Sequence, residues 1–329
     1  MPTSTYKAPS LVILALASSL AGGCATTGNR AGNVEAQLAA RAPSPVTIDS
    51  VPIAYHVFGR GPIVFAHPGG PGVDWRYLRM PEVEKVATVV YIEPFGSGSS
   101  GNLADPNGYT IAHYVAVVEQ LRQRFGLDRI VLLGHSHGGF IAQAYALAYP
   151  QHLRGLILLD TSPTTGPDWQ KDVAANVGWF AHEPWFAAAV PGLQQESTAK
   201  TDDDLTAVLR RIMPLYFFDW TGRSKEFEPL RAQIRVAAAP NQSGSAPAAD
   251  AVPVAPFDVR SQLPKIATPT LIVVGTKDFI CSPKMAQVIH EGIAGSRLVV
   301  LAHSGHMGHI EEPREHARAV GDFLATLAP

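Results

Sequence analysis

The stretch "RIVLLGHSHGGFIAQAYALAYP", residues 129–150, contains the strongest fold signal in the chain. It begins with a short apolar, β-branched run typical of a buried strand, and it ends in a helical pattern that stops at Pro150. The pentapeptide GHSHG lies between the two. A serine at the centre of such a strand-to-helix turn is held in a strained conformation that exposes its hydroxyl at the sheet edge. We predict that Ser136 is a nucleophile, with a structural turn serine as the alternative.

Six apolar runs have the length and composition of buried parallel strands. They are residues 62–68, 87–94, 129–136, 155–163, 269–278 and 297–306. Helical stretches separate most of them. In one of these, Thr110 is a plausible N-cap and Gly126 a plausible C-terminal stop. The alternation predicts an α/β fold with a doubly wound, mostly parallel sheet.

The alternation is interrupted between residues 162 and 257. This region contains two helical, aromatic-rich segments followed by a loose stretch rich in Ala, Pro and Ser. We interpret 162–257 as an inserted helical cap. The core then comprises residues 46–161 and 258–329.

A serine hydroxyl needs a base to remove its proton, and the base needs a carboxylate to orient it. Asp278 follows one late strand, and His306 follows the next. Ser136, Asp278 and His306 occur in the order that this strand–turn–helix architecture uses for a catalytic triad. Asp160, at the end of the strand after the nucleophile, is the alternative acid.

Other histidines lie nearby in sequence. His303 and His309 flank the predicted base, but the first is close to the strand end and the second begins a helix. His67, His135 and His137 show no metal-ligand spacing, and we expect no metal ion or other cofactor.

Acyl transfer also needs N–H donors for a developing oxyanion. The backbone N–H of His137, directly after the nucleophile, is one candidate. The other should come from "FAHPGGPG", residues 65–72, where Gly69 and Gly70 lack Cβ atoms and allow a substrate to approach their amides. The alternative for this loop is an ordinary glycine–proline turn.

The chain of 329 residues has a hydrophobic content of 46% and a net charge of −2. It is long enough for a large core, and it shows no long basic run, so nucleic acid is not an expected partner.

The N-terminus has the pattern of an export signal. An apolar run, residues 11–20, is too short to span a bilayer and is followed by "AGGC" ending at Cys24. Small residues before a cysteine resemble a bacterial lipoprotein processing site, so we predict a signal segment 1–24, lipidation of Cys24 and a flexible tether 25–45. Membrane anchoring on the periplasmic side, at the outer membrane, is the predicted location. The alternative is a secreted or periplasmic protein that carries no anchor.

The core motifs resemble the α/β-hydrolase fold and, within it, the prolyl aminopeptidase family of serine peptidases. "HPGGPG" (67–72) is similar to that family's H-G-G-P-G loop, and "YIEPFGSGSS" (91–100) to its D-Q-R/F-G-x-G-x-S segment. "GHSHGG" and "GHMGHIEEP" occupy the nucleophile and histidine positions. The chain differs at three sites: Pro68 replaces the usual histidine, Glu93 the usual aspartate, and His137 a frequent tryptophan.

The resemblance implies that acids of the cap hold the free α-amine of a peptide substrate. An ammonium group in a dry pocket needs such a partner. Glu226 and Glu228 are our preferred candidates, with Glu183 as a further acid and Trp220 as an apolar contact. The acids at 202–204 instead suit the first turn of a helix. The cap tryptophans and Phe217 either line a pocket or form the cap's own core.

Three functions remain open from the sequence. The first is an aminopeptidase that releases N-terminal proline or other small residues from short peptides. The second is a carboxylesterase, lactonase or amidase with the same triad. The third, from another class, is a ligand-binding lipoprotein without turnover.

Overall fold

The computed structural model describes residues 45–195, 198–241 and 256–327. Cys24, the predicted signal segment 1–24 and residues 25–44 of the predicted tether lie outside the described residues. Within the described ranges, no helix has the length and apolar character needed to cross a membrane.

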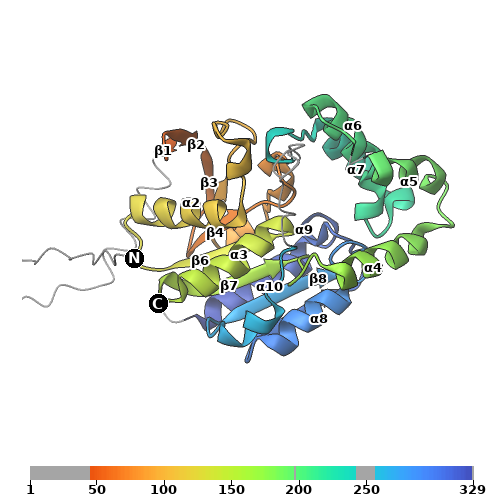
Figure 1. Ribbon diagram of the computed structural model, residues 1–329. Coiled ribbons are helices and arrows are strands. Elements are labelled where there is room, and N and C mark those ends of the chain that lie inside the picture. The colour runs from red at the N-terminus through yellow and green to blue at the C-terminus, as the bar shows by residue number, and fades with distance from the viewer. Residues whose placement is uncertain (1–44, 196–197, 242–255, 328–329) are drawn as a thin grey trace, which may run out of the picture.

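A seven-stranded sheet forms the centre of the protein (Figure 1). Its strands, in spatial order, are β3 (Tyr55–Gly59), β5 (Thr88–Ile92), β4 (Ile63–His67), β6 (Ile130–His135), β7 (Leu153–Leu159), β8 (Thr270–Gly275) and β9 (Arg297–Leu301). β3 pairs antiparallel with β5, and the other neighbours pair parallel. All six predicted strands are present, which confirms the doubly wound, mostly parallel α/β fold.

Three N-terminal strands are present that the sequence patterns did not predict. β1 (Val46–Ile48) and β2 (Val51–Ile53) form a separate antiparallel pair. β3 is an edge strand whose side chains are mostly half-buried. Short edge strands of this kind lack the continuous apolar run that identifies a central parallel strand.

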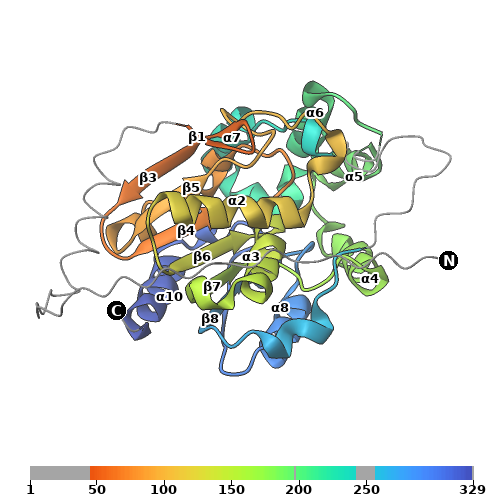
Figure 2. The same cartoon turned by 60° about the vertical axis from the view of Figure 1, so that its left-hand side comes forward.

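Helices cover both faces of the sheet (Figure 2). The side chains of β6 alternate between these faces: Leu132 packs in one hydrophobic cluster and Leu133 in another. The core helices are α2 (Ile111–Arg124), α3 (His137–Ala148), α8 (Pro283–Gly292), α9 (Gly308–Glu311) and α10 (Pro313–Thr326). Residues of α2, α3 and α8 belong to the first cluster, and residues of α10 belong to the second.

The segment between β7 and β8 is helical, as the sequence predicts for the inserted cap. It contains α4 (Pro167–Asn176), α5 (Phe186–Gln195), α6 (Asp202–Ile212) and α7 (Trp220–Gln233). Figure 1 shows α5, α6 and α7 grouped together at the upper right, away from the sheet. Phe180 and Ile212 of the cap pack with Phe279, which follows the predicted triad acid. The cap is therefore packed directly against the loop that carries Asp278.

Candidate active site

Ser136 lies at the sharp turn between β6 and α3. Its φ of 53° and ψ of −120° are unusual for a residue other than glycine. Two hydrogen bonds maintain this strained conformation. The Ser136 N–H donates to Leu159 O, and the Thr161 hydroxyl donates to Ser136 O at 2.7 Å. Gly138 must be glycine here, since a Cβ would lie 2.2 Å from the His67 carbonyl oxygen. The pentapeptide thus forms the predicted turn, and Ser136 lines a pocket.

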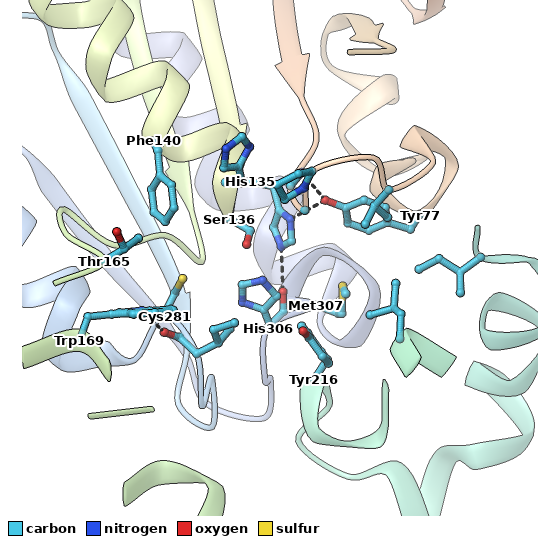
Figure 3. Close-up of a pocket in the computed structure, with 18 residues that line it drawn as sticks. Tyr77, His135, Ser136, Phe140, Thr165, Trp169, Tyr216, Cys281, His306 and Met307 are labelled. Atoms are coloured by element: carbon cyan, nitrogen blue, oxygen red, sulfur yellow. Dashed lines mark hydrogen bonds between the residues drawn. The ribbon is translucent and has the colours of Figure 1, made fainter. Parts of the chain in front are cut away.

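The structure brings the predicted base and acid together. His306 Nδ1 is 2.8 Å from Asp278 Oδ2, and both side chains are buried. The other oxygen, Asp278 Oδ1, accepts the backbone N–H groups of Ile280 and Cys281 at 3.0 and 2.9 Å. Hydrogen bonds to both of its oxygens therefore fix the orientation of the Asp278 carboxylate. In Figure 3 the hydroxyl of Ser136 and the ring of His306 face each other across the pocket.

The alternative acid and bases have other partners. Asp160 Oδ1 accepts the N–H of Gly275 at 2.9 Å. Burial, followed by the nearby charge of Asp278, holds the pKa of the Asp160 carboxyl well above its usual range. His309 contacts the Tyr77 carbonyl through Nε2, and His303 is exposed. The geometry thus favours His306 with Asp278 over each of these alternatives.

The glycine loop lies directly on the nucleophile turn. A Cβ on Gly69 would lie 2.5 Å from the Ser136 Cβ, and Gly70 has a φ of +67°, a conformation that favours glycine. Gly69, Gly70 and His137 all line the pocket with Ser136. However, the Gly69 N–H already donates to the Tyr77 hydroxyl. No hydrogen bond among the described residues uses the Gly70 N–H, so Gly70 is the better partner for His137 in an oxyanion hole.

The pocket has a volume of about 200 Å³ and is largely apolar. Its hydrophobic wall comes from both core and cap and includes Phe140, Trp169, Leu209, Ile234, Ile280 and Met307. Among the described residues that line it, none is an aspartate or glutamate. A small apolar group fits this lining better than a charged one.

The structure does not bring the four predicted cap contacts to this pocket. Glu226 and Glu228 are exposed and pair with arginines three residues away on α7. Glu183 accepts from the Thr221 hydroxyl, and Trp220 is buried against aromatic residues of the cap core. The structure therefore does not place these four predicted substrate contacts among the residues that line this pocket. Glu226, Glu228 and Trp220 contact side chains that are close to them in sequence, whereas the pocket is formed by segments far apart in the chain.

Of the cap aromatics considered from sequence, only Trp169 lines the pocket, among the described residues. Its indole N–H donates to Ile280 O at 2.6 Å, which ties the cap to the Asp278 loop. Sequence reasoning missed three other aromatic lining residues, Tyr77, Phe140 and Tyr216. Tyr77 follows the glycine loop closely in sequence, which is a weak indication of a role at the site. No sequence pattern, however, distinguishes it from an ordinary tyrosine of the core.

Burial favours the neutral form of two further histidines. It lowers the pKa of His137, which lines the pocket, to about 4 and that of His67, at the end of β4, to about 3. Burial and then the charge of Asp278 hold the pKa of the Cys281 thiol well above its usual range. Cys281 is therefore a weak competitor for the nucleophile role, because the thiolate is the reactive form.

Asp278, Cys281 and His306 also form a donor set of the kind that binds metal ions, with ligand atoms within 4.8 Å of one another. The carboxylate oxygens are already engaged by the His306 ring and by two backbone N–H groups. A cation would have to displace the hydrogen bond between Asp278 and His306. The arrangement fits a hydrogen-bonded acid–base pair better than a metal centre.

Comparisons with known proteins agree with this geometry. A family model for the alpha/beta hydrolase fold matches residues 62–313. A proline iminopeptidase of Saccharolobus solfataricus is 32% identical over 289 residues, which cover 82% of this chain and 87% of the relative. A 2-hydroxymuconate semialdehyde hydrolase of a Pseudomonas species is 28% identical over 82% of this chain and 89% of the relative.

Solved structures show the same architecture. A hydrolase from Pseudomonas aeruginosa superposes with a TM-score of 0.65 at 25% identity and covers 87% of this chain and 100% of that chain. Proline iminopeptidase from Mycobacterium smegmatis has a TM-score of 0.64 at 20% identity, over 86% of this chain and 98% of that chain. Together with the family match and the relative at 32% identity, these findings identify the chain as a member of the α/β-hydrolase family that is similar to the proline iminopeptidases.

Proposed function

We propose that the protein is a serine hydrolase that releases N-terminal proline or other small apolar residues from short peptides through an acyl-enzyme. The observation that carries the proposal is the contact between His306 and Asp278 beside Ser136, at the wall of a small apolar pocket. The similarity to proline iminopeptidases supports the choice of proline as the acyl group. A proline side chain is compact and apolar, as this lining requires.

The reaction follows from the positions of the groups. His306 Nε2 accepts the proton of the Ser136 hydroxyl while the serine oxygen attacks the substrate carbonyl. The N–H groups of His137 and Gly70 bind the oxyanion, and each such donor is worth about 3 kcal/mol. His306 then protonates the departing amine. Water, activated by the same imidazole, hydrolyses the acyl-enzyme and restores Ser136.

Asp278 makes this base effective. Its carboxylate holds the His306 ring with Nδ1 protonated, so that Nε2 has a free lone pair toward the serine. It also stabilises the imidazolium that forms during attack. The two backbone N–H groups on Oδ1 fix the carboxylate before the reaction begins.

A second candidate is an esterase or lactonase for a small neutral acyl group. It is favoured by the lack of a carboxylate among the described residues that line the pocket. A peptide's ammonium would instead have to bind carbonyl oxygens and the aromatic faces of residues such as Trp169. Such cation–π contacts contribute about 0.5–2 kcal/mol.

The two candidates differ in whether the free amine is needed. Proline p-nitroanilide and N-acetylproline p-nitroanilide should be compared at equal concentration, with p-nitrophenyl butyrate as a neutral ester. We expect kcat/KM for the free amine to exceed that for the acetylated compound by at least about tenfold, a difference of ~1.4 kcal/mol. Equal turnover of the two anilides, with faster cleavage of the ester, would replace the aminopeptidase by the esterase.

A further inference from the structure

A chain of buried hydrogen bonds joins the three loops of the candidate active site. The Gly69 N–H donates to the Tyr77 hydroxyl, which lies 2.8 Å from His135 Nδ1. His135 Nε2 in turn lies 2.9 Å from the carbonyl oxygen of His306. Figure 3 shows these contacts as dashed lines running from the glycine loop to the His306 loop. Tyr77 and His135 are 5% and 1% exposed, so water does not compete for these bonds.

The chemistry of the groups fixes the direction of every bond. A carbonyl oxygen only accepts, so His135 Nε2 must carry the proton and donate to His306 O. A neutral imidazole then has a lone pair on Nδ1, which accepts the Tyr77 O–H. The tyrosine oxygen remains available to accept the Gly69 N–H. The arrangement has one consistent set of protons and leaves none of these five groups unsatisfied.

From this geometry we propose that Tyr77 and His135 are positioning residues. They hold the glycine loop, residues 65–72, and the loop that carries His306 in place relative to Ser136. The inference rests on the serine hydrolase mechanism proposed above. His135 immediately precedes Ser136 in sequence, so this series of hydrogen bonds is anchored at the centre of the site. Neither residue takes part in proton transfer to substrate, because their polar atoms are already used.

Tyr77 acts on the oxyanion hole through one peptide group. By binding the Gly69 N–H, it sets the orientation of a glycine that lies against Ser136, where an added Cβ would meet the Ser136 Cβ, and that precedes Gly70. The Gly70 N–H, which no described residue binds, is then left for the substrate oxyanion. Oxyanion donors are effective only when they are oriented before the reaction, so a loosened loop should lower the rate more than it lowers substrate binding.

His135 is suited to this role because it stays neutral. Its ring lies 4.7 Å from the ring of His306, between centroids. Burial, and then the charges of His306 and His309, hold the pKa of His135 well below its usual range. When His306 takes the serine proton, His135 therefore keeps its single proton on Nε2. The bond to His306 O survives this step of the reaction.

The first test removes one hydroxyl. In Tyr77→Phe the Gly69 N–H and His135 Nδ1 lose their partner, and we expect kcat to fall about 10- to 100-fold with KM changed less than about threefold. Inactivation by a serine-directed fluorophosphonate should slow by a similar factor. Tyr91→Phe is a matched control, since Tyr91 is also buried and its hydroxyl bonds Met80 N and Glu84, outside the pocket.

The second test replaces the histidine. The amide of His135→Gln can still donate to His306 O and accept from Tyr77, whereas His135→Leu can do neither. The glutamine variant should keep at least about tenfold more kcat than the leucine variant, and thermal melting shows whether both fold. Wild-type values of kcat and inactivation rate in Tyr77→Phe, or equal losses in Tyr77→Phe and Tyr91→Phe, would overturn the proposal. Failure of the fluorophosphonate to label wild-type Ser136 would instead overturn the serine hydrolase mechanism itself.

Discussion

At the residue scale, the backbone of Ser136 holds a conformation that costs about 1–3 kcal/mol and that surrounding hydrogen bonds maintain. Those bonds involve its N–H and C=O, not its hydroxyl. The side chain is therefore free for chemistry, while the main chain bears the strain. This separation lets activity and stability be tested independently at one position.

Ser136→Ala should lower kcat by about 10⁵- to 10⁶-fold, because the attacking oxygen is removed. The melting temperature should stay within a few degrees of wild type, since alanine keeps every backbone bond of the turn. Hydrolysis of the best anilide or ester and thermal unfolding are the two measurements. Substantial residual turnover in the variant would exclude Ser136 as the nucleophile.

Asp278→Asn should reduce kcat by about 10⁴-fold, because an amide in place of the carboxylate favours the wrong tautomer of His306 and cannot stabilise its charge. Asp160→Asn is the matched comparison. Burial and the nearby charge of Asp278 raise the pKa of Asp160 well above its usual range, which favours the neutral carboxyl, and asparagine is neutral too. We expect its kcat within about tenfold of wild type. A larger loss in Asp160→Asn than in Asp278→Asn would transfer the acid role to Asp160.

At the scale of elements, α9 joins the cap to the base loop. The carboxyl of Glu311 accepts the N–H of Phe218, from the cap, at 2.7 Å, and that of Gly305, beside His306, at 2.6 Å. The His306 N–H donates to the carbonyl oxygen of the cap residue Tyr216 at 2.8 Å. The cap and the predicted base, His306, are thus held by the same short set of contacts.

Glu311 should also make stability depend on pH. Burial raises its pKa from 4.5 to about 8, so between these values the folded chain binds more protons than the unfolded chain. The contribution of Glu311 to the unfolding free energy is complete below pH 4.5 and is lost as the pH rises through about 8.

The matched variant is Glu311→Gln, which keeps acceptor oxygen but does not titrate. Relative to this variant, wild type should lose up to about 1.4 kcal/mol of unfolding free energy per pH unit across this window. Denaturant unfolding at several pH values measures the difference. Parallel curves for the two proteins would show that Glu311 is ionised throughout.

At the scale of the whole molecule, neutral buried histidines are distributed around the site. The pKa values of five are lowered, with burial as the largest cause in each: His67, His135, His137, His309 and His316. In the unfolded chain each has an ordinary value of 6.5. Their stabilising contribution is therefore present above pH 6.5 and is lost as the pH falls toward the folded values.

We expect the melting temperature to fall steeply below pH 6, because total stability is only about 5–15 kcal/mol and each histidine contributes up to about 1.4 kcal/mol per pH unit. His316 tests this best, since it is 2% exposed, its Nε2 has no partner among the described residues, and it lies outside the pocket. His316→Leu should flatten the acid limb of the stability curve between pH 6 and 4. An unchanged slope in that range would show that His316 does not titrate on unfolding.

The sequence by itself determined the parts of this protein that depend on neighbours in the chain. Strand periodicity, the N-cap at Thr110 and the glycine-flanked turn at Ser136 are local, because hydrogen bonding and steric limits act within a few residues. The order of Ser136, Asp278 and His306 followed from where parallel strands end. These features therefore predicted both the fold class and the residues that meet at the site.

The tertiary structure alone decided what surrounds that site. The pocket wall combines Gly70, Leu209 and Ile280, whose separation in the chain leaves no local pattern. The cap acids Glu226 and Glu228 looked suitable by residue type, yet nearby arginines neutralise them at the surface. Tyr77 looked like an ordinary core aromatic, and only its contacts with Gly69 and His135 indicate a role. Long-range packing chooses such partners, because it depends on how the whole chain fills space.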